Sequence, residues 1–213
     1  MKILVALIIG GLLVASGFYL KDTLLPGSKS DSSSLTSNSC GPNGCGGNSM
    51  LHNIEITDEK VFIREMIPHH QEAVDTSKIV LAQTQDPELK KFTQDVIDAQ
   101  TKEVAQMKRW LKSWFNEEYV TNSNYMPMMG DLTKFEDKAL AKMYVEGMIR
   151  HHQGAIDMAQ KVLTLNPRPE IKKMADDIIS VQQTEVNTLQ QWLGTKYQGV
   201  EAKDEMNHMM NIH

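Results

Sequence analysis

The sequence predicts an all-α protein: a four-helix bundle made of two duplicated helical hairpins, preceded by an N-terminal transmembrane or signal segment. Three observations support this fold class. Residues 59–111 repeat as 141–193, apolar residues in both copies recur with helical spacing, and no convincing strand pattern appears between residues 50 and 195. The chain has 213 residues, which suits one ordinary domain plus additional segments.

Composition excludes several classes of protein. The formal net charge is −5, so the chain has no excess of Lys and Arg with which to neutralise nucleic-acid phosphates. Two cysteines are too few for a disulfide-built mini-fold or a four-thiolate zinc site. The unusual features are 14 methionines and 7 histidines, because both side chains ligate soft or borderline metals.

Residues 1–21 are predicted to be a signal anchor or a signal peptide. An uncharged run from Ile3 to Leu20 follows Lys2, and as a helix it would be about 27 Å long, close to the hydrocarbon thickness of a bilayer. Small residues at 15–17 could be cleaved, but the apolar run continues past them, which favours an anchor. Either outcome implies export: the protein is anchored and faces the periplasm or the extracellular side, or it is secreted.

Residues 22–50 form a predicted flexible tether, since Ser, Gly and Asn dominate it. It contains Cys40 and Cys45 in the segment CGPNGC. Outside the reducing cytosol, a local disulfide closing the Pro-Gly turn is the favoured interpretation. A two-thiol metal or redox site is the alternative.

The main organisational feature is the repeat within a predicted domain at 51–194. The two copies align without a gap, and 21 of 53 positions are identical. Each copy reads as a helical hairpin, with helices over about 58–85 and 87–115, and again over about 133–165 and 168–193. Thr57 or Asp58 is a plausible N-cap, Pro87 lies near a helix start, and Gly194 marks the last helix end.

Four amphipathic helices joined by short turns within each hairpin make an antiparallel bundle. On the first helix, residues of the inward stripe are Phe62, Met66, Ala73, Ser77 and Val80. The link between the hairpins, about 116–132, is long enough for a ferritin-like crossover, although a simple return is also compatible with its length.

Polar residues lie where the core is expected. His69 and His70 flank Met66 on the first stripe, while Gln100 and Glu103 lie on the stripe of the second helix. An inward glutamate is costly unless it is paired, protonated or bound to metal. The second copy repeats the whole set, as Met148, His151, His152, Gln182 and Glu185. In each hairpin the first histidine and the glutamate are equally far in sequence from the turn that joins the two helices. These side chains are therefore expected at one level of the bundle.

This set predicts a metal site, with a metal-free hydrogen-bond network that fixes helix register as the alternative. Di-iron bundles use a Glu three residues before each His, but those positions hold Met66 and Met148. Imidazole with thioether favours copper, and sulfur favours Cu(I), over zinc, iron or manganese. The glutamates and glutamines either complete the coordination or orient the imidazoles. The sequence leaves open whether there is one shared site or two.

Two further segments are rich in methionine and histidine and are interpreted as weaker, flexible copper sites. The inter-hairpin loop has Met126, Met128 and Met129. The tail at 195–213 contains Met206, His208, Met209, Met210 and His213. Core filling explains the tail poorly, because no apolar periodicity continues beyond Gly194.

The repeated motif, MIPHHQEAV and MIRHHQGAI, resembles the exported family catalogued as domain of unknown function number three hundred and five, which includes CopM-like copper-binding proteins. The resemblance covers about 51–194. It implies a ferritin-like four-helix fold and copper binding in the periplasm or at the cell surface. The motif residues it implies are Met66, His69 and His70, with Met148, His151 and His152.

The sequence therefore predicts a copper-binding protein of the cell envelope that sequesters, buffers or hands on copper, and is not an enzyme. Its predicted partners are the metal ion, the membrane through the N-terminal segment, and a copper carrier or efflux protein; nucleic acid is excluded. The alternatives are a ferritin-like di-metal oxidase and a metal-free, membrane-anchored interaction module. The oligomeric state is left open.

Overall fold

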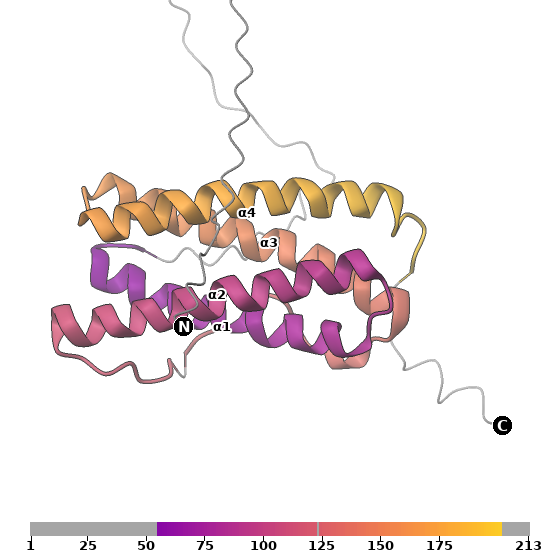
Figure 1. Cartoon of the computed structure of the whole chain (residues 1–213), viewed down its shortest axis with the longest axis horizontal. Coiled ribbons are helices and arrows are strands. Elements are labelled where there is room, and N and C mark those ends of the chain that lie inside the picture. The colour runs from indigo at the N-terminus through magenta and orange to yellow at the C-terminus, as the bar shows by residue number, and fades with distance from the viewer. Residues whose placement is uncertain (1–54, 123, 202–213) are drawn as a thin grey trace, which may run out of the picture. The chain divides into compact units, whose positions relative to one another are not determined.

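The computed structural model describes residues 55–122 and 124–201, and within these ranges the chain is helical without strands (Figure 1). The elements are α1 (Glu59–Gln83), α2 (Pro87–Phe115), the short 3₁₀ helix η1 (Leu132–Lys134), α3 (Asp137–Thr164) and α4 (Pro169–Thr195). The predicted all-α four-helix bundle is confirmed. The predicted membrane or signal segment, the whole tether with Cys40 and Cys45, and the Met/His-rich end of the tail lie outside the described residues.

Side-chain caps set the boundaries of the first hairpin. The Asp58 carboxylate accepts a hydrogen bond of 2.9 Å from the Val61 amide, as predicted for an N-cap. Helix α1 ends at Gln83, two residues earlier than expected, because Thr84 has an extended backbone. The Asp86 carboxylate then caps α2 by accepting from the Glu88 and Leu89 amides. The turn is therefore short.

The third helix begins at Asp137, so the predicted start at 133 and the predicted link of 116–132 are wrong. Asp131 accepts from the amide of Thr133 at 3.1 Å and starts the separate turn η1, after which Phe135 is extended. Helix α4 also continues past the predicted stop at Gly194, since the Lys196 amide still bonds the Trp192 carbonyl. The connection between the hairpins is therefore 116–136.

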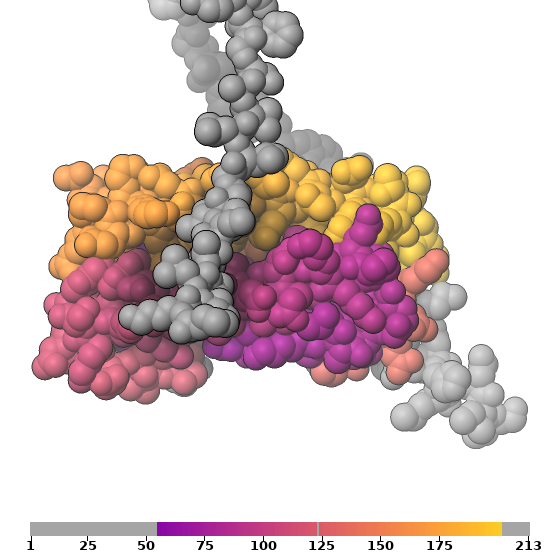
Figure 2. Space-filling view, in the orientation of Figure 1, coloured from indigo at the N-terminus to yellow at the C-terminus, as the bar shows by residue number. Residues whose placement is uncertain are grey.

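This connection crosses the bundle from end to end. Arg168, at the start of α4, places its Nε 3.0 Å from the carboxylate of Glu59, at the start of α1. Helices α1 and α3 are therefore antiparallel, and α2 and α3 run in the same direction. A simple return cannot join two parallel helices, so residues 116–136 form a crossover. The two hairpins lie against each other as adjoining layers (Figures 1 and 2).

The bundle core consists of two hydrophobic clusters separated by polar residues. The inward stripe predicted for α1 is fully buried, from Phe62 at 0% to Val80 at 0% exposure. One cluster contains Phe62, Met66 and Met107, and the other contains Ala73, Val80 and Met148. Along α1 the histidine pair falls between the two clusters. The middle of the bundle, at the level of His69 and His70, is thus polar and lies between two apolar ends; we call this level the polar band.

None of the helices that the structure describes is long and apolar enough to span a bilayer.

Candidate metal centre

Four buried histidines occupy the polar band. His69 and His70 come from α1, His151 and His152 come from α3, and each is at most 1% exposed. The ring centroids of His69 and His151 are 3.7 Å apart, and each lies 6.2 Å from the ring of its sequence neighbour. The rings therefore form one group, which we call the imidazole cluster, at the contact between the two hairpins.

The two outer histidines of the cluster face carboxylates on the partner helix of their own hairpin. His70 Nε2 lies 2.9 Å from Glu103 Oε2, and His152 Nε2 lies 2.7 Å from Glu185 Oε2. The glutamate side chains are 27% and 21% exposed. The two glutamates therefore lie at the edge of the core and reach inward to the buried rings, so the expected contact with the histidines is present although each glutamate side chain is partly exposed to water.

A backbone carbonyl determines the protonation of a third ring. His151 Nε2 is 2.8 Å from the carbonyl oxygen of His69, and because that oxygen can only accept, Nε2 carries the proton and donates it. Neutral His151 therefore has its lone pair on Nδ1. Among the described residues, the buried Nδ1 atoms of His70, His151 and His152 have no hydrogen-bond partner. Metal-binding histidines typically show this pattern, with one nitrogen held by an oxygen and the other left for the ion.

The surroundings keep His151 uncharged. Its pKa is lowered well below the usual value of histidine, first because burial removes water from the ring and then because His152 and His70 lie close by. A neutral imidazole is the form that binds metal. The apo protein thus already holds this side chain in the state required of a ligand.

The other residues predicted for the central site also lie in or beside the polar band. Gln100 and Gln182 are each 3% exposed, and their Oε1 atoms have no hydrogen-bond partner among the described residues. Met66 and Met148 are both at 0% exposure, in opposite hydrophobic clusters. Both halves of the repeat therefore bury an amide and a thioether side chain as well as two histidines.

His, Cys, Asp and Glu alone do not complete a metal site in residues 55–122 and 124–201, where no three of them are arranged to hold an ion. A hard cation needs several oxygen ligands. A soft cation accepts imidazole together with thioether sulfur, and Met66 and Met148 each precede a histidine pair by one helical turn. The donor set therefore fits copper or a similar soft ion better than calcium or magnesium.

The methionines of the crossover differ from one another. Met126 is 58% exposed, Met128 is half-buried, and Met129 is 3% exposed. A weak, flexible copper site was expected here, yet Met129 belongs to the second hydrophobic cluster. Of the tail residues predicted to bind metal, Met206, His208, Met209, Met210 and His213 all lie outside the described residues.

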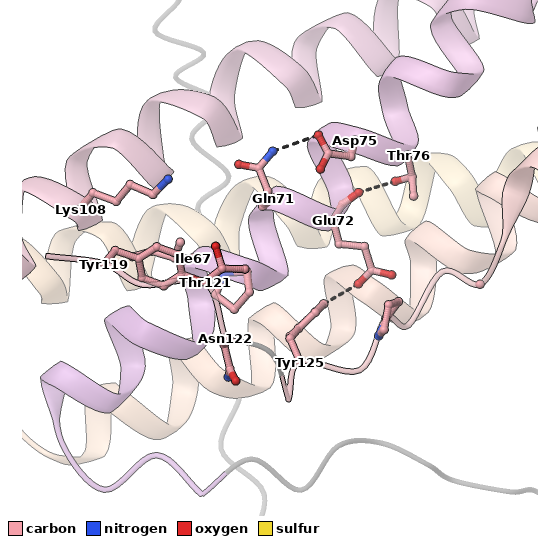
Figure 3. A pocket seen from close by; sticks show the side chains of 13 residues that line it. Ile67, Gln71, Glu72, Asp75, Thr76, Lys108, Tyr119, Thr121, Asn122 and Tyr125 are labelled. Atoms are coloured by element: carbon pink, nitrogen blue, oxygen red, sulfur yellow. Dashed lines mark hydrogen bonds between the residues drawn. The ribbon is translucent and has the colours of Figure 1, made fainter.

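One residue at the centre was missed from the sequence. Glu72, whose side chain is only 7% exposed, places Oε2 3.6 Å from His151 Nε2. It also accepts hydrogen bonds from the Tyr125 hydroxyl and, at 2.7 Å, from the Met129 amide. Figure 3 shows Glu72 reaching from α1 to Tyr125 at the wall of a cavity of about 590 Å³. The available signal was its repeat counterpart, which is Gly154.

Fold and site together define a duplicated four-helix bundle with an imidazole cluster at its centre. Residues 59–193 match the family model described as Domain of unknown function (DUF305). That match covers more than half of the chain, so the chain belongs to the DUF305 family. The resemblance seen in the His-His-Gln motif is thereby confirmed.

Solved structures with the same fold include several forms of CopM. The Cu(I)-bound form has a TM-score of 0.61 and 34% identity, with 66% of this chain and 98% of that chain covered. The Cu(II)-bound form has a TM-score of 0.59 and 33% identity, with 65% of this chain and 97% of that chain covered. A DUF305 protein from Streptomyces coelicolor is described as a candidate secreted protein. Its structure has a TM-score of 0.58 and 25% identity, with 64% of this chain and 93% of that chain covered.

A curated relative matches a shorter segment. The protein L153 of Acanthamoeba polyphaga mimivirus, which is uncharacterised, is 44% identical over 48 residues, or 22% of this chain. The chain spans about a third of that protein's length (32%).

Proposed function

We propose that this protein binds copper in the cell envelope, where it captures or buffers Cu(I) or hands it to a carrier, and that it has no catalytic role. The observation that carries the proposal is the imidazole cluster. Three of its rings present Nε2 to an oxygen atom and keep Nδ1 buried without a hydrogen-bond partner among the described residues. Leaving such nitrogens unsatisfied is costly in a core, and a bound ion would remove that cost.

The relatives support copper as the ion. CopM has been solved with Cu(I), with Cu(II) and with silver, a soft monovalent ion. In the present chain a buried methionine precedes each buried histidine pair by one helical turn, and imidazole with thioether is the pair that selects Cu(I). His69, His70, His151 and His152 act as the central ligands in this proposal, assisted by Met66 and Met148.

The carboxylates and amides have supporting roles. Glu103 and Glu185 hold the outer imidazoles by Nε2, which fixes the ring orientation and makes the other nitrogen a better ligand. Gln100 and Gln182 either add an oxygen to the coordination or orient a neighbour. Copper is the cargo of the protein in this proposal, so a site that binds and releases the ion fits better than a closed structural site.

The location in the envelope rests on the N-terminal sequence and on a relative. The uncharged run within residues 1–21 has the length of a membrane anchor, and one DUF305 relative is described as a candidate secreted protein. We interpret the single crossover as ferritin-like connectivity. The exported domain would then face the periplasm or the outside, tethered through residues 22–50.

The test is a competition titration of the full chain with Cu(I) and a chromogenic chelator. Replacing all four cluster histidines by Gln should abolish the tightest binding, while His208→Ala with His213→Ala in the tail should leave it unchanged. Circular dichroism establishes that each variant folds. Tight Cu(I) binding that survives loss of the cluster would overturn the central site, and no tight binding by the unaltered chain would overturn the function.

A second candidate, a metal-free interaction module, is favoured by one observation. His151 is bonded to a carbonyl, and the outer histidines face carboxylates, contacts that could fix helix register without an ion. This candidate predicts that neither copper nor zinc changes the melting temperature. A stabilising shift with copper would exclude it, because only binding to the folded state produces one.

A further inference from the structure

We infer that Met128, on the crossover, supplies a thioether ligand beside His69, and that Glu72 is the positioning residue that holds it there. The inference deepens the proposed function and rests on it. It makes the two halves of the imidazole cluster chemically different: His69 lies beside sulfur, whereas His151 lies beside the Glu72 carboxylate.

The first observation concerns the space at Gly154. A Cβ atom at this position would lie 3.2 Å from His69 Nε2 and 3.5 Å from Met128 Sδ. The sulfur and the imidazole nitrogen therefore converge on the same point of α3. A side chain at 154 would crowd the His69 nitrogen and lie in contact with the Met128 sulfur, so glycine leaves the space between them open.

The second observation is how the crossover is attached to the bundle. Glu72 accepts hydrogen bonds from the Tyr125 hydroxyl and from the Met129 amide, so its carboxylate binds the crossover on both sides of Met128 in the chain. The carboxylate is nearly buried, at 7% exposure, and hydrogen bonds to a charged acceptor are stronger than neutral ones. Figure 3 shows the bond to Tyr125.

The third observation is the difference between the repeats. Glu72 and Gly154 occupy equivalent positions, one residue after the repeated His-His-Gln sequence. In the first copy this position provides the carboxylate near His151. In the second copy this position is Gly154, which has no side chain, and the Met128 side chain lies in the space next to it on the side of His69. One departure from the repeat thus both anchors the crossover and makes room for it.

Sulfur also supplies what the other side chains lack. The described His, Cys, Asp and Glu residues do not form a group of three suited to a metal. A thioether adjacent to the cluster adds a soft donor, which favours Cu(I) over zinc or Cu(II). A half-buried methionine on a connection can also reach toward solvent, which gives an ion a donor to meet before it enters the core.

The test uses Met128→Leu, a nearly volume-conserving change that removes only the sulfur, with Met129→Leu as the matched control. Met129 is the next residue and is buried, but its sulfur lies against Gly147. Met128→Leu should weaken the tightest Cu(I) binding at least about tenfold, since losing a ligand costs no less than losing an orienting partner. Zinc affinity and melting temperature should not change.

A second readout identifies the sulfur directly. With ¹³C-labelled methionine methyl groups in the full chain, one equivalent of Cu(I) should shift the resonance that disappears in Met128→Leu and leave that of Met129 in place. Glu72→Gln should weaken Cu(I) binding about 10–100-fold and reduce this shift, with zinc again unaffected.

The outcomes separate this inference from the proposed function. Cu(I) binding that is unchanged in Met128→Leu, with an unshifted methyl resonance, would overturn the role of Met128 while leaving copper binding intact. An unaltered chain that binds no Cu(I) would overturn both. Equal losses in Met128→Leu and Met129→Leu would also overturn the inference, because they would indicate a general packing effect of the crossover.

Discussion

At the scale of single residues, the proposed metal site depends on the different roles of the two nitrogens of each imidazole ring. An oxygen atom holds Nε2 of His70, His151 and His152, and that contact directs Nδ1 into the core. Similar contacts recur in both hairpins because the residues are duplicated. The orienting carboxylates should therefore matter for binding although they lie at the edge of the core.

We expect Glu103→Gln and Glu185→Gln each to weaken copper binding about 10–100-fold. The amide can still contact Nε2 but no longer supplies the charge that strengthens the imidazole as a ligand. Stability should change little, because both side chains are more than a fifth exposed and water screens the pair. Competition titration measures the effect, with Asp95→Asn in the surface pair with Lys91 as the control. Equal affinities in all three variants would contradict this role.

The lowered pKa of His151 leads to a pH dependence of the apo protein. Below about pH 6.5 the unfolded chain binds a proton at this residue, whereas the folded chain, with its depressed pKa, does not. The unfolded state then holds more protons, so the free energy of unfolding should fall as the pH drops below that value and be level above it. Urea unfolding of metal-free protein over this range measures it.

His151→Gln is the matched variant for this prediction. It removes the titrating group, so its urea midpoint should depend less on pH than that of the unaltered chain. A midpoint that is independent of pH in the unaltered chain would show that burial does not suppress protonation of this ring.

At the scale of helices, the two halves of the bundle use different chemistry at equivalent contacts. Ser77 Oγ and Tyr144 Oη share a buried hydrogen bond of 2.7 Å between α1 and α3. The residues at the equivalent positions of the other copy are Ala159 and Phe62, which are both fully buried. The same packing position is thus polar in one half and apolar in the other.

This pair predicts a specific non-additivity. Tyr144→Phe and Ser77→Ala should each cost about 1 kcal/mol, because each leaves the partner hydroxyl buried without its bond. The double variant reproduces the apolar pair of the other half and should be less destabilised than the sum of the two. Urea unfolding of the four proteins measures the coupling, and strict additivity would contradict the contact.

The short turn between α1 and α2 is held by an ion pair with a residue that is distant in sequence but adjacent in the fold. Asp86 caps α2 and also pairs with Lys196, whose Nζ lies 2.8 Å away just beyond α4. We expect Asp86→Ala to cost about 1 kcal/mol or somewhat more, since it removes the cap and the pair. Asp86→Asn keeps a capping oxygen and should lose less. Thermal unfolding ranks them, and equal losses would contradict a capping role.

The sequence predicts elements better than connections in this protein. Helix positions follow from the 3.6-residue period and from the duplicated motif, and the stripe through Phe62 and Val80 is buried as predicted. The crossover is less predictable, because the local cap at Asp131 delays α3 and because the contact of Glu72 with Tyr125 spans 53 residues. Comparing the two copies of the repeat identifies the residues that they share. Glu72 and Gly154 were not identified in this way, because they occupy equivalent positions but differ.

At the scale of the whole molecule, copper binding and folding stability are coupled. An ion that binds only the folded bundle stabilises it by about 2.7 kcal/mol when its free concentration is 100 times the Kd. For a chain of this size, that corresponds to a rise in melting temperature of roughly 5–10 °C. Scanning the full chain with Cu(I) held at a chelator-buffered free concentration measures the rise.

The dependence of this rise on free Cu(I) distinguishes the central site from the Met/His-rich tail. A site inside the core must raise the melting temperature in proportion to the logarithm of free Cu(I) above its Kd. Replacing Met206, Met209 and Met210 by Leu should lower the number of ions bound without changing that dependence, since the proposed stabilising ion is held by the imidazole cluster. A melting temperature that follows the tail substitutions instead would place the stabilising ion at the tail and leave the imidazole cluster as a metal-free network.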